Sequence, residues 1–396
     1  MNNFRENRIL LINAGLRLPG SLPTAGGTRA VAKFWLVLLA LVVSLVVAPP
    51  AQALTILVTY DSSVSSLANA AQVEAAFAVA AQTFQSRYSN PITVNITVYW
   101  GNTGPFTSGI GLGASRTQFL GTYAYTDVTS ALSASRTSSA DNSAVASLPL
   151  SNPTAADSWL IPTAEVKALG LPDIPPNDPG RDGEIGFASD QSYTFDPTNR
   201  AVAGKYDFIG VAEHEIAEVL GRVTFGLNTS GYVPYDLFRF TANGTRSFDP
   251  NGSGVYFSID NGATQLKSFN PASAGGDIQD WATGTTPDAY DAFASNGKKE
   301  ALSSADVTAL DIIGYDVRPI LPVYLTGVTL TNGTFRFGFT NTPGAGFTVL
   351  TSTNPSLSLN NWTVLGTPTE GPAGLFQFTD SPAGTVKQRF YRVSSP

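Results

Sequence analysis

Two prolines, Pro319 and Pro322, divide the chain into parts with different hydrophobic patterns. Before them, segments with apolar residues at helical spacing alternate with short β-type runs, which is typical of an α+β domain. After them, the apolar runs are short and β-type and are separated by Gly, Asn or Pro. We therefore expect an α+β domain at residues 54–317, a linker at 318–322 and a small β-sandwich at 323–396.

Within the first domain, the spacing of apolar residues predicts individual helices and strands. The segment 101–115 is rich in Gly and Ser and is predicted as a loop. The predicted strands are 54–60, 92–100 and 184–189, and the predicted helices are 67–87, 125–135 and 162–169, followed by the helix that contains His214.

The N-terminal segment has the order of a secretory signal peptide. A basic stretch is followed by an uncharged apolar run at residues 34–47 and by an Ala-x-Ala sequence that ends at Ala53. The run is short for a membrane span, which needs about 20 residues. We expect residues 1–53 to be a signal peptide, the protein to be secreted or periplasmic, and no membrane span to remain after cleavage.

Composition excludes several classes of function. The chain of 396 residues has no cysteine, so disulfide frameworks, thiolate metal sites and cysteine nucleophiles are excluded. Without residues 1–53, the chain keeps 18 basic and 29 acidic residues, a net charge of −11. Nucleic acids need clustered Lys and Arg, which this chain does not contain, so we expect no nucleic-acid partner.

The single histidine of the chain, His214, lies in a predicted amphipathic helix. Glu215 follows it directly, and Glu218 lies one helical turn later on nearly the same face. An imidazole and a carboxylate at this spacing can bind one metal ion, with Glu215 beside them to take a proton from metal-bound water. Gly221 is predicted to end the helix in a left-handed conformation.

The same residues also allow a simpler interpretation. Glu218 and Arg222 can form a surface ion pair worth about 0.3–0.5 kcal/mol, with His214 and Glu215 solvated. A Ser-His-Asp mechanism would also have to use His214, but the Gly-x-Ser-x-Gly sequence of such enzymes does not occur.

The helix at residues 204–222 resembles the signature helix of a group of secreted bacterial metalloproteases of the zincin type, with the pattern H-E-I-x-E-V-L/M-G-R. Residues 236–240, 276–281 and 302–315 resemble segments that follow this helix in that group. The resemblance spans residues 54–317 and implies a zincin-like, metzincin-like catalytic domain. The C-terminal part resembles β-sandwich modules of secreted bacterial proteins, which implies that it binds a surface or polymer.

A catalytic zinc needs about three protein ligands, and the sequence does not contain the usual third one. The common metzincin position falls near Thr224, which has no suitable donor. A carboxylate must complete the set, and we expect Asp236, which belongs to a resembling segment and precedes an apolar aromatic run. Asp207 and Asp277 are alternatives. One imidazole and two carboxylates also admit manganese, iron or calcium instead of zinc.

Together these features predict a secreted metal-dependent endopeptidase that acts on a protein or peptide. His214, Glu218 and Asp236 would hold zinc, and Glu215 would be the general base. Arg222 would orient Glu218 or Asp236. The alternative is a catalytically inactive, zincin-like surface or adhesion protein.

Overall fold

The computed structural model describes residues 53–154, 158–224, 227, 231–319, 321–342, 345–372, 374–381 and 388–395. The predicted signal peptide lies outside the described residues, except for Ala53. Contacts divide the chain into two compact units, which separate after Pro319. The first unit contains helices and strands and the second contains strands, so the fold class is α+β, as predicted.

The first unit is built on a four-stranded sheet with the order β1-β2-β6-β3. The first three of these strands are parallel, and β3 is an antiparallel strand at the edge. Their bounds are β1 (Thr55–Tyr60), β2 (Thr93–Trp100), β3 (Gly113–Thr117) and β6 (Gly183–Phe187).

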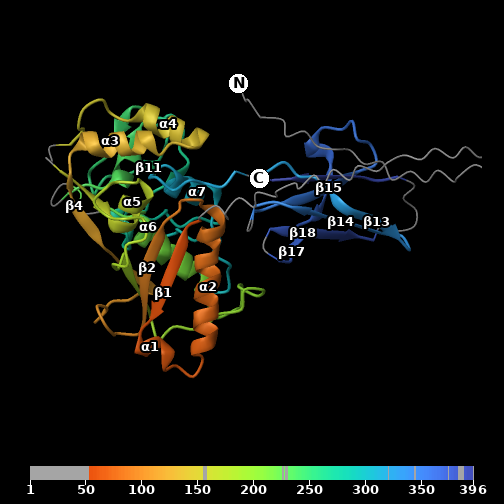
Figure 1. Ribbon diagram of the computed structural model, residues 1–396, viewed down its shortest axis with the longest axis horizontal. Helices are drawn as coiled ribbons and strands as arrows, with labels where there is room; N and C mark the ends of the chain where they lie inside the picture. Colours follow the sequence, from red (N-terminus) through yellow and green to blue (C-terminus); the bar gives the residue numbers. More distant parts are fainter. Residues whose placement is uncertain are drawn as a thin grey trace, which may run out of the picture. The chain divides into compact units, whose positions relative to one another are not determined.

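Two helices, α2 (Ala70–Arg87) and α6 (Phe208–Leu220), pack against this sheet and against each other. Figure 1 shows α2 running alongside β1 and β2. Burial alternates along β2, where Val94, Ile96 and Val98 face the core. Because α6 contacts α2, β3 and β6, its position is fixed along its length.

The correction to the sequence prediction concerns the segment 101–115, which was expected to be a loop. The edge strand β3 begins inside it, at Gly113, and pairs with β6. An edge strand with one partner needs no apolar alternation, so Gly and Ser are tolerated in it.

The remaining elements of the first unit are short. They are α1 (Ser62–Ser65), β4 (Phe119–Tyr123), α3 (Tyr125–Ala134), α4 (Ser139–Ser147), β5 (Trp159–Pro162), α5 (Thr163–Ala168), β7 (Tyr193–Thr194), β8 (Tyr206–Asp207), η1 (Pro234–Phe238), β9 (Arg239–Ala242), β10 (Thr245–Arg246), β11 (Tyr256–Phe257), β12 (Lys267–Ser268), η2 (Ala272–Ala274) and α7 (Ser304–Asp311).

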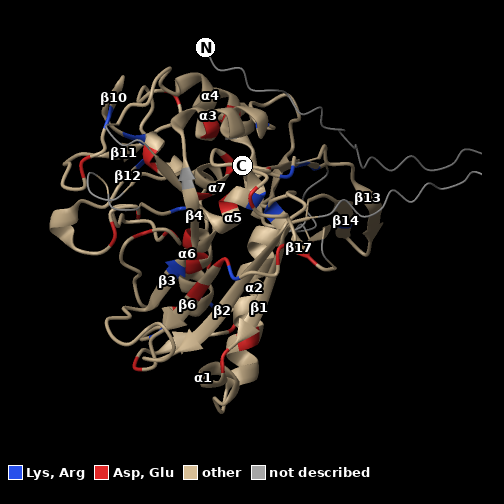
Figure 2. Ribbon diagram, turned by 60° about the vertical axis from the view of Figure 1, so that its left-hand side comes forward, with Lys and Arg blue, Asp and Glu red and all other residues tan. Residues whose placement is uncertain are grey.

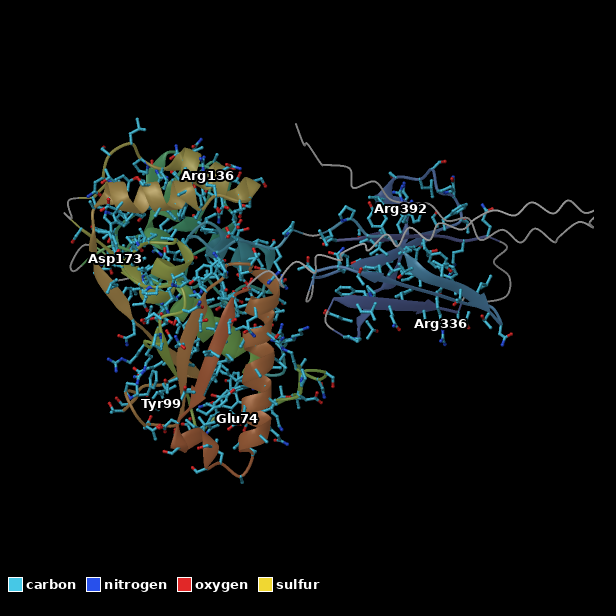
Figure 3. The ribbon with its side chains drawn as sticks, viewed as in Figure 1. Glu74, Tyr99, Arg136, Asp173, Arg336 and Arg392 are labelled. Carbon is cyan, nitrogen blue, oxygen red and sulfur yellow. The ribbon has the colours of Figure 1, made fainter. Side chains whose placement is uncertain are left out.

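The second unit consists of two antiparallel sheets, with the orders β13-β14-β18-β17 and β16-β15-β19. Phe335, Phe337 and Phe339 of β14 pack in one core with Val349 of the other sheet. Arg336 alternates with these rings and is exposed (Figure 3). The bounds are β13 (Thr326–Thr331), β14 (Thr334–Thr340), β15 (Thr348–Ser352), η3 (Leu359–Asn361), β16 (Thr363–Gly366), β17 (Thr369–Glu370), β18 (Leu375–Asp380) and β19 (Phe390–Ser394).

Among the described residues, no helix combines the length and the apolar character that crossing a bilayer requires.

Candidate metal centre

Helix α6 carries three of the five residues predicted for the site. It begins after Asp207 and ends at Gly221, whose φ of 124° lies in the region that favours glycine. His214, Glu215 and Glu218 lie between these ends, and acidic residues are visible along this helix in Figure 2.

The structure brings His214 and Glu218 together with a second carboxylate, that of Asp280. Ligand atoms of the three residues all lie within 4.8 Å of one another. The Nε2 atom of His214 is 3.6 Å from Oε1 of Glu218 and 3.3 Å from Oδ1 of Asp280. These three residues form the candidate metal centre.

Asp280 is held in place by its neighbour Trp281, which is fully buried. The Trp281 indole donates a hydrogen bond of 2.6 Å to Oδ1 of Asp306. Its backbone N–H donates to the carbonyl oxygen of Tyr290, and the backbone N–H of Asn270 donates to the carbonyl oxygen of Asp280. The peptide group that follows the Asp280 side chain is therefore fixed.

Asp236 does not belong to this group, so the predicted third ligand is corrected to Asp280. Asp236 is fully buried in η1, where its Oδ2 accepts a hydrogen bond of 3.0 Å from the N–H of Val233. Its Oδ1 has no hydrogen-bond partner among the described residues. Of the two alternatives, Asp207 pairs with Arg200, and Asp277 lies on the wall of the neighbouring cleft.

Asp236 should instead influence stability in a pH-dependent way. Burial raises the pKa of Asp236 to about 7. The folded protein therefore retains this proton up to about pH 7, whereas an unfolded chain loses it near pH 3.9. The carboxylate has no destabilising effect below about pH 4, and its cost grows as the pH rises to about 7.

We therefore expect the free energy of unfolding of Asp236→Asn, taken relative to that of the wild type, to rise by roughly 2–3 kcal/mol from pH 5 to pH 8. Urea denaturation of both proteins at the two pH values measures this difference. An unchanged difference between the two proteins would show that Asp236 is ionised in the folded state throughout this range.

Arg222 lies beneath the metal centre and is fully buried, which excludes the surface ion pair considered from the sequence. Its Nη1 donates a hydrogen bond of 2.7 Å to Oδ1 of Asp280. Its Nη2 lies 3.5 Å from Oε1 of Glu218. The guanidinium also lies over the ring of Tyr290, 4.3 Å from the centroid. Arg222 thus contacts Glu218 and Asp280, whereas the sequence predicts that it orients Glu218 or Asp236.

Both oxygens of Glu218 accept further hydrogen bonds. Ser115 of β3 donates to Oε2 at 2.7 Å, and Gln279 donates to Oε1 at 3.0 Å. Gln279 in turn accepts a hydrogen bond of 3.3 Å from the hydroxyl of Thr224. Each carboxylate oxygen has two lone pairs, so these donors fix the orientation of Glu218 and still leave acceptor capacity.

The imidazole of His214 is oriented by the backbone. Its Nδ1 lies 2.9 Å from the carbonyl oxygen of Ala289, so Nδ1 carries the proton that makes this hydrogen bond. Nε2 then faces the two carboxylates. A hydrogen bond from the other ring nitrogen to a carbonyl or carboxylate is the usual arrangement for a metal-binding histidine.

The centre attracts positive charge. Burial lowers the pKa of His214, but the carboxylates of Asp280 and Glu218 outweigh this and hold it well above its usual range. Burial raises the pKa of Glu218, but His214, Arg222 and Gln279 bring it down to about 2. The two carboxylates therefore favour a cation at Nε2, which a proton or a metal ion could provide.

The distances between the ligand atoms fit a small divalent ion. Zinc bonds of about 2.0–2.1 Å in tetrahedral geometry place neighbouring ligand atoms about 3.4 Å apart. The separations of 3.3 and 3.6 Å from Nε2 lie close to this value. His214, Glu218 and Asp280 could thus hold a metal ion.

Glu215 lies beside the centre, next to the edge strand. A Cβ atom on Gly113 would lie 2.5 Å from Oε1 of Glu215, so any larger residue there would force the end of the Glu215 side chain to move. Burial and the neighbouring Glu218 raise the pKa of Glu215 well above its usual range. Glu215, His214 and Glu218 all line one cleft of about 620 Å³.

The chain matches no known protein family, no curated protein and no solved structure.

Proposed function

We propose that the protein is a secreted, metal-dependent endopeptidase whose first unit is a zincin-like, metzincin-like domain. The observation that carries this proposal is the convergence of His214, Glu218 and Asp280 within 4.8 Å, beside a cleft that Glu215 also lines. The cleft is bordered by β3, which lies at the edge of its sheet, and edge strands can bind an extended substrate segment.

In this proposal, His214, Glu218 and Asp280 hold zinc or another divalent metal. When bound, such a metal polarises a peptide carbonyl group and lowers the pKa of bound water. Arg222, Ser115 and Gln279 hold the two carboxylates in their binding orientation. Arg222 also offsets part of their negative charge.

Glu215 acts in this proposal as the general base. The position of Glu215 is fixed, because its carboxyl group lies against Gly113 of β3 and its backbone belongs to α6. A carboxyl group whose pKa is raised by burial accepts a proton from water more readily near neutral pH than an ordinary one. It can then transfer this proton to the leaving amine.

The proposal is tested by removing and restoring the metal. We expect purified protein to cleave an unfolded protein such as casein, to lose this activity with a chelator such as 1,10-phenanthroline, and to regain it with about one equivalent of zinc. The proposal would be contradicted if protein with less than roughly one tenth of an equivalent of metal cleaved casein at an undiminished rate.

A second candidate function is favoured by the charge balance of the centre. If His214 carries a proton, it and Arg222 balance Glu218 and Asp280 without any metal. The first unit would then be an inactive scaffold in a surface or adhesion protein. Metal-free protein whose melting temperature does not change when zinc is added would support this alternative.

For the second unit, we propose a β-sandwich module that binds a surface or polymer. Its support is the hydrophobic core that the two sheets share. The signal peptide proposed at residues 1–53 would bring both units to the exterior of the cell.

A further inference from the structure

The cleft beside the metal centre is strongly acidic. No Lys or Arg is among the described residues that line it. Its acidic residues are Glu215, Glu218, Asp277, Asp280, Asp291 and Glu300. Three of these belong to the proposed catalytic machinery, which leaves the other three without a role in it.

Two of the remaining residues, Asp291 and Glu300, form what we call the acidic pair. Both residues line the cleft although they are only 6% and 3% exposed. Oε1 of Glu300 accepts a hydrogen bond of 2.9 Å from the N–H of Ser295. Its Oε2 is buried and has no hydrogen-bond partner among the described residues. A buried carboxylate oxygen without a partner is costly unless a ligand supplies one.

The cations near the acidic pair are paired with other acids. Lys267 lies 2.7 Å from Asp288, and Arg200 lies 2.8 Å from Asp207 and also contacts Glu213. Arg200 donates a hydrogen bond of 2.6 Å to the backbone carbonyl oxygen of Glu300, and no ion pair with the Glu300 carboxylate is found among the described residues. Negative charge therefore remains uncompensated at the cleft wall. Consistent with this, burial and the neighbouring Asp288 raise the pKa of Asp291 to about 7.

The acidic pair lies close to the metal centre. A Cβ atom on Gly210 would lie 2.5 Å from Cβ of Glu300. Gly210 precedes His214 by one helical turn, about 6 Å along the axis of α6. Asp291 lies two residues after Ala289, whose carbonyl group orients His214. Glu300 thus lies about one helical turn from His214 along α6, roughly the length of two residues of an extended peptide.

An apolar surface accompanies the acids. Phe293 lines the same cleft and is 48% exposed, which is high for a phenylalanine. A lysine or arginine side chain can pack its methylene groups on such a ring while its charged end reaches a carboxylate. Uncharged apolar side chains would leave the acids unpaired.

We propose that Asp291, Glu300 and Phe293 form a specificity pocket that binds a lysine or arginine side chain of the substrate close to the scissile bond. The inference rests on the proposed endopeptidase function for its biological meaning. The binding of the cationic side chain can nevertheless be measured without catalysis.

The test uses three fluorescent peptides that are identical except for Lys, Arg or norleucine at one central position. Binding is measured by anisotropy with the Glu215→Gln protein, and cleavage is measured with the otherwise unaltered protein. We expect the Lys or Arg peptide to bind about tenfold or more tightly than the norleucine peptide and to be cleaved next to the cationic residue. Asp291→Asn and Glu300→Gln should each reduce this preference to about threefold or less.

Asp277→Asn is the matched control, because it removes the same charge from the exposed rim of the cleft. It should leave the preference nearly unchanged. If all three variants lost the preference for Lys or Arg equally, the preference would come from the negative potential of the whole cleft, and the pocket would be overturned. Equal binding of all three peptides would also overturn it. Selective binding without any cleavage would support the pocket and contradict the proposed function instead.

Discussion

Asp280→Asn is expected to lose tightly bound divalent metal, whereas Asp236→Asn is expected to keep it. Asp280 supplies one of the three candidate ligand atoms that lie within 4.8 Å of one another, and Asp236 supplies none of them. An amide is a poor ligand for zinc compared with a carboxylate, so affinity should fall by about 100-fold or more. Competition with a chromophoric chelator measures this affinity.

The pair of variants is matched because each replaces one buried aspartate by its amide. Asp280→Asn keeps an oxygen that can accept the hydrogen bond from Arg222, so the fold should be retained, and circular dichroism checks this. The opposite result, metal lost in Asp236→Asn and retained in Asp280→Asn, would restore the assignment made from the sequence.

Glu215→Gln is expected to keep the metal and to lose peptide cleavage by about 10²–10⁴-fold in kcat/KM. The glutamine has nearly the same shape and fits beside Gly113, but it cannot accept a proton from water. The measurement is cleavage of a quenched fluorescent peptide, together with the metal content of each preparation. Full activity of Glu215→Gln would remove this residue from the mechanism.

Gly113→Ala provides an independent check on the same carboxyl group. The added methyl group would lie 2.5 Å from Oε1 of Glu215, so the flexible end of that side chain must move. We expect lower activity with little loss of stability. Gly111→Ala is its control, since a methyl group there would contact nothing within 4 Å. Equal activity of the two variants would show that the position of Glu215 does not matter.

The helix of the site could be predicted from the sequence because its determinants are local. The apolar spacing along α6 and the glycine at position 221 follow from short-range geometry. The neighbourhood of His214, Glu215 and Glu218 follows from the helical period alone. Their burial could not be predicted this way, because it depends on β3 and on the segment around residue 280.

The third acid could not be chosen from the sequence because the contact spans a long stretch of chain. Asp280 reaches the centre because Trp281 is buried against Asp306, which lies 25 residues later in the sequence. Asp280 has the same local sequence feature that favoured Asp236, namely an aspartate close to an aromatic residue. Two equal local signals cannot be ranked without the tertiary contacts.

The edge strand was missed for a different reason. Residues 113–117, Gly-Ala-Ser-Arg-Thr, have no apolar alternation, because β3 has a strand neighbour on one side only and borders the cleft. The glycine at position 113 leaves space for the carboxyl group of Glu215 and does not form a turn. A sequence pattern read for turns therefore assigns this glycine to a loop.

Anomalous X-ray diffraction at the zinc absorption edge, from crystals of the protein grown with zinc, tests the central claim most directly. We expect one strong peak bounded by Nε2 of His214 and by carboxylate oxygens of Glu218 and Asp280, at bond lengths of about 2.0–2.2 Å. The absence of a peak at this position, with His214 in direct contact with Asp280, would contradict the metal centre and the endopeptidase built on it.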